Sequence, residues 1–225
     1  MLNHSVKRIS DSIEKRAEDM QKKGALIVIS GFSGAGKGTL VNKLLSDYDR
    51  FSLSISMTTR APREGEENGR EYFFVTREEF EANIEKDGFL EHASYVGNYY
   101  GTPRAYVEQE IAKGRDVILE IEVQGALQIK KKFPEAILMF VTPPSIAELE
   151  KRLRGRGTEN DETVLKRLSR AKEETDYISG YDYILINDDL KECEERAIRY
   201  IDAAKTAPIR NKDFIAELLG ELEAY

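Results

Sequence analysis

The chain has 225 residues and a formal net charge of −7, from 34 Lys and Arg against 41 Asp and Glu. This length suits one large core that carries small inserted lobes, and the acidic balance argues against binding nucleic acid or an anionic membrane through bulk charge. One cysteine and two histidines exclude an intrachain disulfide and leave no material for a thiolate or histidine metal cluster. The apolar runs are far shorter than the roughly 18 residues of a membrane span, and the first residues lack an apolar signal core, so we expect a cytoplasmic protein.

The first part of the chain predicts a helix, a buried strand and a second helix. Residues 1–23 have an amphipathic pattern, with apolar residues at steps of three or four: Val6, Ile9, Ile13, Ala17 and Met20. The apolar, β-branched run at 25–30 is typical of a strand buried on both faces, as in a parallel sheet. A glycine-rich turn at 31–38 follows, and then helical spacing in Leu40, Val41, Leu44 and Leu45.

The same alternation returns in the second half of the chain. Apolar runs predict strands at 117–121, 136–141 and 183–186, and helical patterns lie at 124–132, 145–154 and 161–178. Ser145 and Glu148 have the spacing of a capping box. The tail beyond residue 189 is predicted helical, with a break near Pro208 and a last amphipathic set of Phe214, Leu218 and Leu222. We therefore predict an α/β fold with a three-layer parallel sheet.

Residues 50–101 break this alternation. Short strand-like pieces lie at 51–56, 72–75 and 90–95, and residues 63–69 are rich in turn formers. Thr76 and Glu79 predict a capping box at the start of one helix. We interpret the segment as an inserted lobe with a small mixed sheet. A second interruption at 152–161, rich in Arg and Gly, predicts a mobile cover.

The chemistry is carried by the turn between the first buried strand and its helix, which reads Gly31-Phe-Ser-Gly-Ala-Gly-Lys-Gly-Thr39. Glycines let successive backbone N–H groups point inward, and the helix N-terminus adds partial positive charge, so this context predicts a phosphate-binding loop. Lys37 supplies a full charge to the outer phosphates. The strict motif fails at one position, because Gly38 stands where Ser or Thr is expected. Thr39 is then the nearest hydroxyl for a magnesium ion.

Charged residues elsewhere indicate what else this site binds. Arg60 and Arg63 are three residues apart, and guanidinium groups capture phosphate in a bidentate manner; the alternative is two solvated surface arginines. Glu120 and Glu122 stand at the carboxyl end of a predicted parallel strand, where open α/β sheets bind ligands, although a structural charge network is the competing explanation. Arg152, Arg154, Arg156 and Arg167 place further cations on the cover and the helix after it.

Taken together, these residues resemble the guanylate kinase family over residues 24–205. The landmarks of the resemblance are Ser33-Gly-Ala-Gly-Lys37, Ser56 to Arg63, Gly97-Asn-Tyr-Tyr-Gly101, Glu122-Val-Gln-Gly125, Arg154-Gly-Arg156-Gly-Thr158 and Asn187-Asp-Asp189. The resemblance implies a P-loop NTPase core at 24–54, 106–145 and 170–225, an NMP-binding lobe at 55–105 and a helical lid at 146–169. The N-terminal helix at 1–23 lies outside it.

The resemblance also implies an activity: transfer of the γ-phosphoryl group of ATP to GMP, and to dGMP, with Mg²⁺ as cofactor. Catalytic roles fall to Lys37, Arg60, Arg156 and Arg167. ATP would contact Gly31, Phe32, Ser33, Gly34, Ala35, Gly36, Lys37, Gly38, Thr39, Arg152, Arg156 and Asn187. GMP would contact Ser56, Arg60, Arg63, Tyr72, Glu91, Tyr100, Gly101, Thr102 and Glu122.

Two departures from the family pattern accompany this resemblance. Gly38-Thr39 is similar to the adenylate kinase form of the loop, and Glu120 and Glu122 stand where the family has Asp. Two other functions stay open at this point: a kinase of the same architecture acting on AMP, dTMP or a sugar phosphate, and a non-catalytic scaffold module that binds phosphopeptides. Glu91, a carboxylate that can accept from N1–H and the 2-amino group of guanine, argues against the first. The intact lysine-bearing loop argues against the second.

Overall fold

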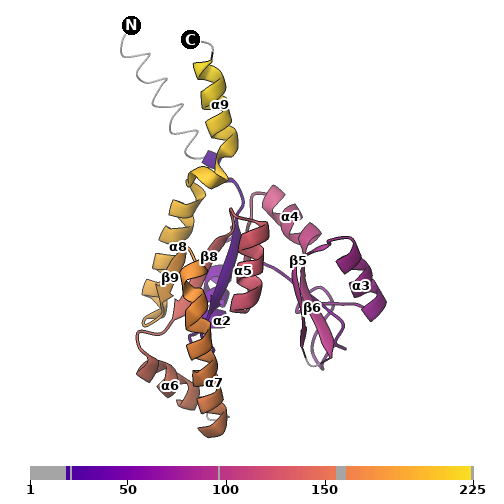
Figure 1. Cartoon of the computed structure of the whole chain (residues 1–225), viewed down its shortest axis with the longest axis vertical. Helices are drawn as coiled ribbons and strands as arrows, with labels where there is room; N and C mark the ends of the chain where they lie inside the picture. Colours follow the sequence, from indigo (N-terminus) through magenta and orange to yellow (C-terminus); the bar gives the residue numbers. More distant parts are fainter. Residues whose placement is uncertain (1–18, 21, 96, 156–160, 224–225) are drawn as a thin grey trace.

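A five-stranded parallel sheet lies at the centre of the computed structural model, which describes residues 19–20, 22–95, 97–155 and 161–223 (Figure 1). The strand order is β2-β7-β1-β8-β9, and every neighbouring pair is parallel. The bounds are β1 Leu26–Gly31, β2 Phe51–Leu53, β7 Asp116–Glu120, β8 Ile137–Thr142 and β9 Tyr183–Ile186. The predicted α/β class with a parallel sheet is confirmed.

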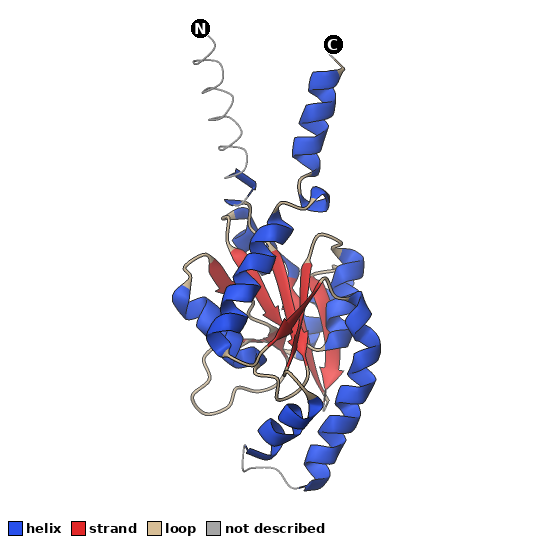
Figure 2. Ribbon diagram, turned by 90° about the vertical axis from the view of Figure 1, so that its left-hand side faces the viewer, coloured by secondary structure: helices blue, strands red, loops and turns tan. Residues whose placement is uncertain are grey.

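The sheet is the middle of three layers, because its central strand buries side chains on both faces. Ile27 and Ile29 of β1 belong to one apolar cluster, and Leu26 and Val28 belong to the other. The first cluster is completed by α2 (Lys37–Asp47), α6 (Ile146–Gly155), α7 (Asp161–Glu174) and α8 (Leu190–Lys205), and the second by α4 (Arg104–Ala112) and α5 (Val123–Lys132). Figure 2 shows helices on both sides of the strands.

The inserted segment forms a separate four-stranded mixed sheet of order β4-β3-β6-β5. Its strands are β3 Met57–Thr58, β4 Phe73–Phe74, β5 Phe89–Tyr95 and β6 Asn98–Pro103; β3 and β4 are parallel, and the other pairs are antiparallel. The predicted capping box of Thr76 and Glu79 starts α3 (Arg77–Glu85). Phe80 of α3 is fully buried and stacks on Phe89, with ring centroids 4.3 Å apart. The helix is thereby fixed on the small sheet.

One strand-like piece does not belong to this lobe. Residues 51–56 were expected to contribute to the mixed sheet, but β2 pairs with β7 in the main sheet. The physical reason is burial: the Phe51 ring is only 3% exposed and packs edge-on against Tyr48 at the end of α2. The strand lies inside the segment 24–54 that was assigned to the core, and the chain leaves the main sheet after it.

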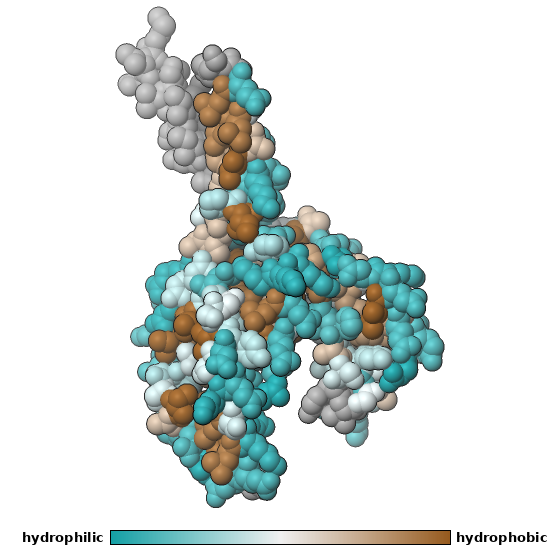
Figure 3. Space-filling view, viewed as in Figure 1, coloured by the Kyte–Doolittle hydropathy of each residue, from teal (hydrophilic) through white to brown (hydrophobic). Residues whose placement is uncertain are grey.

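The C-terminal part departs from the core. The predicted helix at 161–178 ends as α7 at Glu174 and continues as the 3-10 helix η1 (Thr175–Gly180). The predicted break at Pro208 is the 3-10 helix η2 (Pro208–Arg210), after which α9 (Lys212–Leu222) stands away from the sheet with apolar side chains exposed (Figures 2 and 3). Residues 1–18 and 21 of the predicted N-terminal helix lie outside the described residues. Within the described ranges, no helix has the length and apolar character needed to cross a membrane.

A buried ion pair connects the end of α8 to the sheet. Lys205 Nζ lies 2.8 Å from Asp116 Oδ1 and 3.1 Å from Asp116 Oδ2, and both residues are almost completely buried. Asp116 Oδ1 also accepts from the backbone N–H of Ala25, at 2.9 Å. The pair therefore joins the starts of β7 and β1 to the last turn of α8.

We expect Lys205→Met to destabilise the fold by about 3–5 kcal/mol, because removing one partner leaves the other charge buried. Arg50, whose Nε lies 3.5 Å from Asp116 Oδ2, compensates only in part. Urea unfolding measures the effect. Lys191→Met, an exposed position on the same helix, is the control and should change the unfolding free energy by less than about 0.5 kcal/mol. Equal stability of the two variants would remove the pair from the forces that hold α8.

Candidate active site

The glycine-rich turn between β1 and α2 has the backbone shape that its sequence predicts. Gly34 and Gly36 have φ angles of 94° and 88°, in the left-handed region that side chains disfavour. A Cβ on Gly36 would also lie 2.5 Å from the side-chain nitrogen of Asn187. Gly36 is the N-cap of α2 and has no side chain to cap it, so the first N–H groups of this helix point into the turn. Such an uncapped helix start suits an anion.

The Lys37 ammonium group is folded back over this turn. Its Nζ donates to the carbonyl oxygens of Gly31, at 2.7 Å, and Phe32, at 3.2 Å. The backbone thus holds the positive charge at the mouth of the loop. The position is suitable for a lysine that pairs with phosphates arriving there.

Two predicted ATP contacts, Asn187 and Arg152, support the loop from outside. The Asn187 side chain is buried, and its Nδ2 donates to the carbonyl oxygen of Ala35 at 2.9 Å. Arg152 donates from Nη1 to the Asn187 carbonyl oxygen at 2.8 Å and forms an ion pair with Glu148 at 2.9 Å. Both side chains therefore lie beside the loop and fix its surroundings.

Helix α7, which begins in the segment predicted as a lid, reaches the loop through Arg167. Its Nη1 donates to Ser33 Oγ at 2.7 Å, although the two residues are 134 positions apart in the sequence. A guanidinium of α7 thus lies against the glycine-rich turn. Arg156, the other lid arginine named by the sequence, lies outside the described residues.

On the inserted lobe, Arg60 is held by one carboxylate and a set of aromatic rings. Its Nη2 lies 2.9 Å from Glu66 Oε1, and its guanidinium stands 5.4 Å from the Tyr72 ring centroid. The hydrogen bond with Glu66 raises the pKa of Arg60 and lowers that of Glu66. Tyr100 packs edge-on against Tyr72 at 6.0 Å. Sequence reasoning missed Glu66, although an acid three residues after Arg63 was a usable signal.

Arg63 itself extends from the exposed turn that follows β3. Its backbone N–H donates to Glu66 Oε2 at 2.8 Å, so the same carboxylate fixes the turn and the Arg60 guanidinium. The structure thus brings Arg60, Tyr72 and Tyr100 together, with Arg63 on the adjoining turn.

A hydrogen-bonded hydroxyl and carboxylate, Thr102 of β6 and the half-buried Glu91 of β5, lie side by side in the lobe. Thr102, which is fully buried, donates from Oγ1 to Glu91 Oε1 at 2.7 Å. Burial raises the pKa of Glu91, and the hydrogen bond from Thr102 partly counteracts this. Gly101 is closely enclosed, since a Cβ there would lie 2.9 Å from Phe89, and Gly125 at the start of α5 has Glu91 Oε2 3.5 Å from its Cβ position. Ser56, half-buried, ends the segment that leads into β3.

Two predicted carboxylates, Glu120 and Glu122, lie at the end of β7 and the start of α5 in the core. Glu120 ends β7, and its Oε2 would be 3.6 Å from a Cβ on Gly38; desolvation raises its pKa, and the charge of Lys37 opposes the shift. Glu122 is the N-cap of α5 and pairs with Arg170 of α7 at 3.0 Å. Figure 3 shows the molecule hollowed between the core and the inserted lobe, which carry the two groups of residues.

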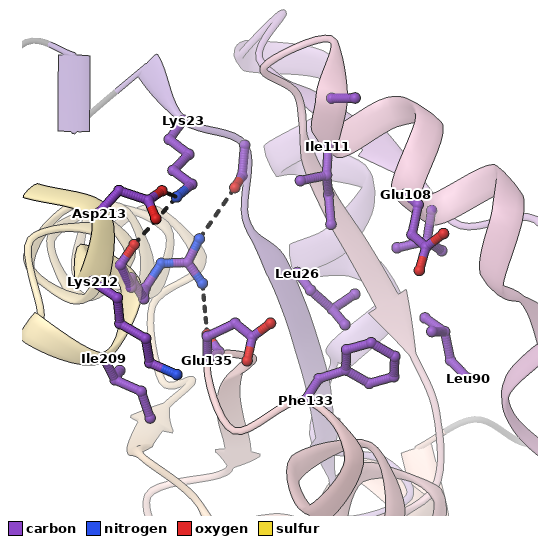
Figure 4. Close-up of a pocket in the computed structure, with 14 residues that line it drawn as sticks. Lys23, Leu26, Leu90, Glu108, Ile111, Phe133, Glu135, Ile209, Lys212 and Asp213 are labelled. Carbon is purple, nitrogen blue, oxygen red and sulfur yellow. Dashed lines mark hydrogen bonds and ion pairs between the residues drawn. The ribbon is translucent and has the colours of Figure 1, made fainter. Parts of the chain in front are cut away.

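A cavity of about 450 Å³ lies elsewhere, at the opposite end of the main sheet (Figure 4). Leu26, Leu90 and Phe133 form its apolar floor, and Lys23 and Asp213 form an ion pair on its rim. None of the residues named by the sequence as site residues lines it. The site is therefore identified from its side chains and not from cavity size.

The parallel sheet and lysine-bearing loop define the chain as a P-loop phosphotransferase of the nucleotide kinase type, with an inserted lobe that carries a mixed sheet. A family model described as guanylate kinase matches residues 23–204. A guanylate kinase of Streptococcus thermophilus (strain CNRZ 1066) is 54% identical over 185 residues, which are 82% of this chain and 88% of that protein. One of Caldanaerobacter subterraneus subsp. tengcongensis is 48% identical over 202 residues, or 90% and 98% of the two chains.

Solved structures agree with this comparison. The crystal structure of guanylate kinase from Anaplasma phagocytophilum has a TM-score of 0.64 and 33% sequence identity, and the match covers 84% of this chain and 90% of that one. This chain belongs to the guanylate kinase family, whose activity is transfer of a phosphoryl group from ATP to GMP. The resemblance stated from the sequence is confirmed.

Proposed function

We propose that this chain transfers the γ-phosphoryl group of Mg²⁺-bound ATP to GMP or dGMP in the cleft between the core and the inserted lobe. The observation that carries the proposal is the half-buried Glu91 carboxylate, which accepts a hydrogen bond from Thr102 on the lobe, across the cleft from the loop of Lys37. A cytoplasmic location is part of the proposal, since both substrates are nucleotides of the cell interior.

ATP is assigned to the core side. Its phosphates would lie in the turn 31–39, against the uncapped start of α2 and the Lys37 ammonium group. Arg167, already at Ser33, would contact the outer phosphates, joined by Arg156 and Arg152 from the lid. Asn187 would border the adenine side, next to the loop carbonyl that it now binds.

GMP is assigned to the lobe. Arg60 and Arg63 would capture its phosphate in exchange for Glu66, with the hydroxyls of Tyr72 and Tyr100 close by. Glu91 would accept hydrogen bonds from N1–H and the 2-amino group of guanine. The hydroxyls of Ser56 and Thr102 would be further polar contacts of the base, and Gly101 would contact GMP through its backbone. Glu122 would face GMP from the core.

The reaction needs no general base. A GMP phosphate oxygen is ionised at neutral pH and attacks the γ-phosphorus directly, while the bond to the β-phosphate oxygen breaks and ADP leaves. The remaining task is to hold two anions in line and neutralise the charge that develops, which Lys37 and the arginines can do. Closure of the lid excludes water that would otherwise accept the phosphoryl group.

The residues of the loop fit a magnesium ion that is carried by ATP. Mg²⁺ prefers oxygen ligands and keeps several waters, so it does not require a protein cage. Within the described ranges no group of three or more His, Cys, Asp or Glu could hold a metal. The Thr39 hydroxyl in the first turn of α2 and the Glu120 carboxylate beside Gly38 offer oxygens at this place. The ion would supply charge neutralisation at the phosphates.

A coupled assay of ADP release with Mg²⁺ and ATP tests the proposal, with GMP, dGMP, AMP, UMP and dTMP offered separately. We expect turnover with GMP and dGMP and at least about tenfold lower kcat/KM with the others. Turnover with AMP or dTMP instead would retain the P-loop chemistry and overturn the assignment of Glu91. Absence of turnover with every acceptor, from a folded protein, would favour the non-catalytic scaffold.

A further inference from the structure

Arg170 of α7 joins two carboxylates that come from different parts of the core. Its Nη2 lies 3.0 Å from Oε2 of Glu122, the N-cap of α5, and its Nε lies 3.2 Å from Oε1 of Glu174, one helical turn further along α7. Glu174 is only 5% exposed. One end of the Arg170 network is therefore fixed in the core, and the other end is a carboxylate at the cleft.

The same face of α7 also contacts the ATP loop. Arg167, three residues before Arg170, donates to Ser33 Oγ at 2.7 Å. Residues three apart on a helix lie side by side. This helix thus touches the phosphate-binding turn with one arginine and the start of α5 with the next.

The charge of Glu122 acts on two other carboxylates of the core, Glu120 and Glu174. The charge of Glu122 raises the pKa of Glu120 and of Glu174, although burial is the larger cause for both. The Lys37 ammonium group acts in the opposite direction on the same two groups. Arg170 is in direct contact with Glu122, although both side chains are largely exposed, and its charge opposes this repulsion at the Glu122 carboxylate.

We propose that Arg170 is a positioning residue that couples the two substrate sites, by tying Glu122 on the GMP side to the helix whose Arg167 reaches the ATP loop. The inference rests on the proposed function, because it takes Glu122 as a GMP contact. GMP that engages Glu122 acts on α7 through Arg170, and α7 acts on the loop through Arg167. Thermodynamic linkage requires the effect to be reciprocal: each nucleotide tightens the other by the same factor.

Calorimetry measures this factor directly. The Kd of GMP is determined without and with saturating ADP, a pair that cannot react, and the Kd of ADP without and with GMP. We expect tightening of about fivefold or more in the unchanged protein. Arg170→Met should bring the factor close to one, and Arg170→Lys should restore part of it, because a lysine can still pair with Glu122. Lys172→Met, exposed on the same helix, is the control and should keep the full factor.

A double-mutant cycle separates coupling from simple loss of charge. Glu122→Gln should lower the factor as Arg170→Met does, and the two changes together should be no worse than either alone. A full coupling factor in folded Arg170→Met would overturn the role of Arg170 and leave the proposed function in place. Failure of the unchanged protein to bind GMP would instead overturn the proposed function itself.

Discussion

Lys37→Ala is expected to lower kcat for GMP phosphorylation by about 10³-fold or more, the scale of loss when a group that stabilises transition-state charge is removed. The Lys37 ammonium is held by two carbonyl oxygens of its own loop, so its charge is present where the phosphates of ATP would lie. Both of these carbonyl oxygens, of Gly31 and Phe32, belong to the core and not to the inserted lobe. The Kd of GMP, measured by calorimetry, should therefore change by less than about threefold, while steady-state turnover nearly disappears.

Lys43→Ala provides the matched control for this experiment. Lys43 lies on the same helix, α2, and pairs with Asp47 and Glu194, away from the loop. Its removal tests whether loss of any lysine from α2 reduces activity. Near-normal turnover in Lys37→Ala would exclude this lysine from the transfer step, whatever the control does.

The middle of the main sheet could be predicted from the sequence because β1, β7 and β8 are almost entirely buried, and strands buried on both faces are continuous apolar runs. The edge strand β9 is also an apolar run, although Ile184 and Ile186 are exposed; β1, β8 and β9 lie within one residue of the expected ranges. The strand at the other edge of the sheet, β2, gave a weaker signal, since only Phe51 of its three residues is buried. Its pairing with β7 depends on how the chain returns to the sheet, which a local pattern does not contain.

The candidate site also has one part that the sequence predicts and another that it does not. Sequence motifs identified the loop of Lys37, because glycine spacing and a strand–helix context are local features. The partners of the site residues were not identified: Glu66 for Arg60, Arg170 for Glu122 and Ser33 for Arg167. Two of these pairs, Arg170 with Glu122 and Arg167 with Ser33, join residues far apart in the chain. Because 33% of the residues are charged, the sequence offers each arginine many alternative partners. Only the fold selects among them.

Glu91→Gln is expected to lower kcat/KM for GMP by about 10²- to 10⁴-fold, mainly through KM, and to leave the KM of ATP within about twofold. The glutamine keeps the shape, and its carbonyl can still accept one hydrogen bond. Its NH₂ group, however, would face the donors of guanine in a desolvated site, where an unpaired polar group is costly. AMP use should not improve, because the lobe would still lack a group matched to adenine.

The pH dependence of the GMP KM supplies a second test of Glu91. Burial raises the pKa of this carboxyl above its usual range, and only the ionised form can accept from both guanine donors. As pH falls toward the raised pKa, the neutral fraction grows and the KM should rise, whereas at higher pH the KM should be constant. Glu91→Gln should reduce this acid limb to the part that protonation of the GMP phosphate causes, and Glu85→Gln, exposed at the end of α3, should retain the full limb. If Glu91→Gln leaves the KM unchanged at every pH, Glu91 does not recognise guanine, and the selectivity for GMP must come from Ser56 and Thr102 alone.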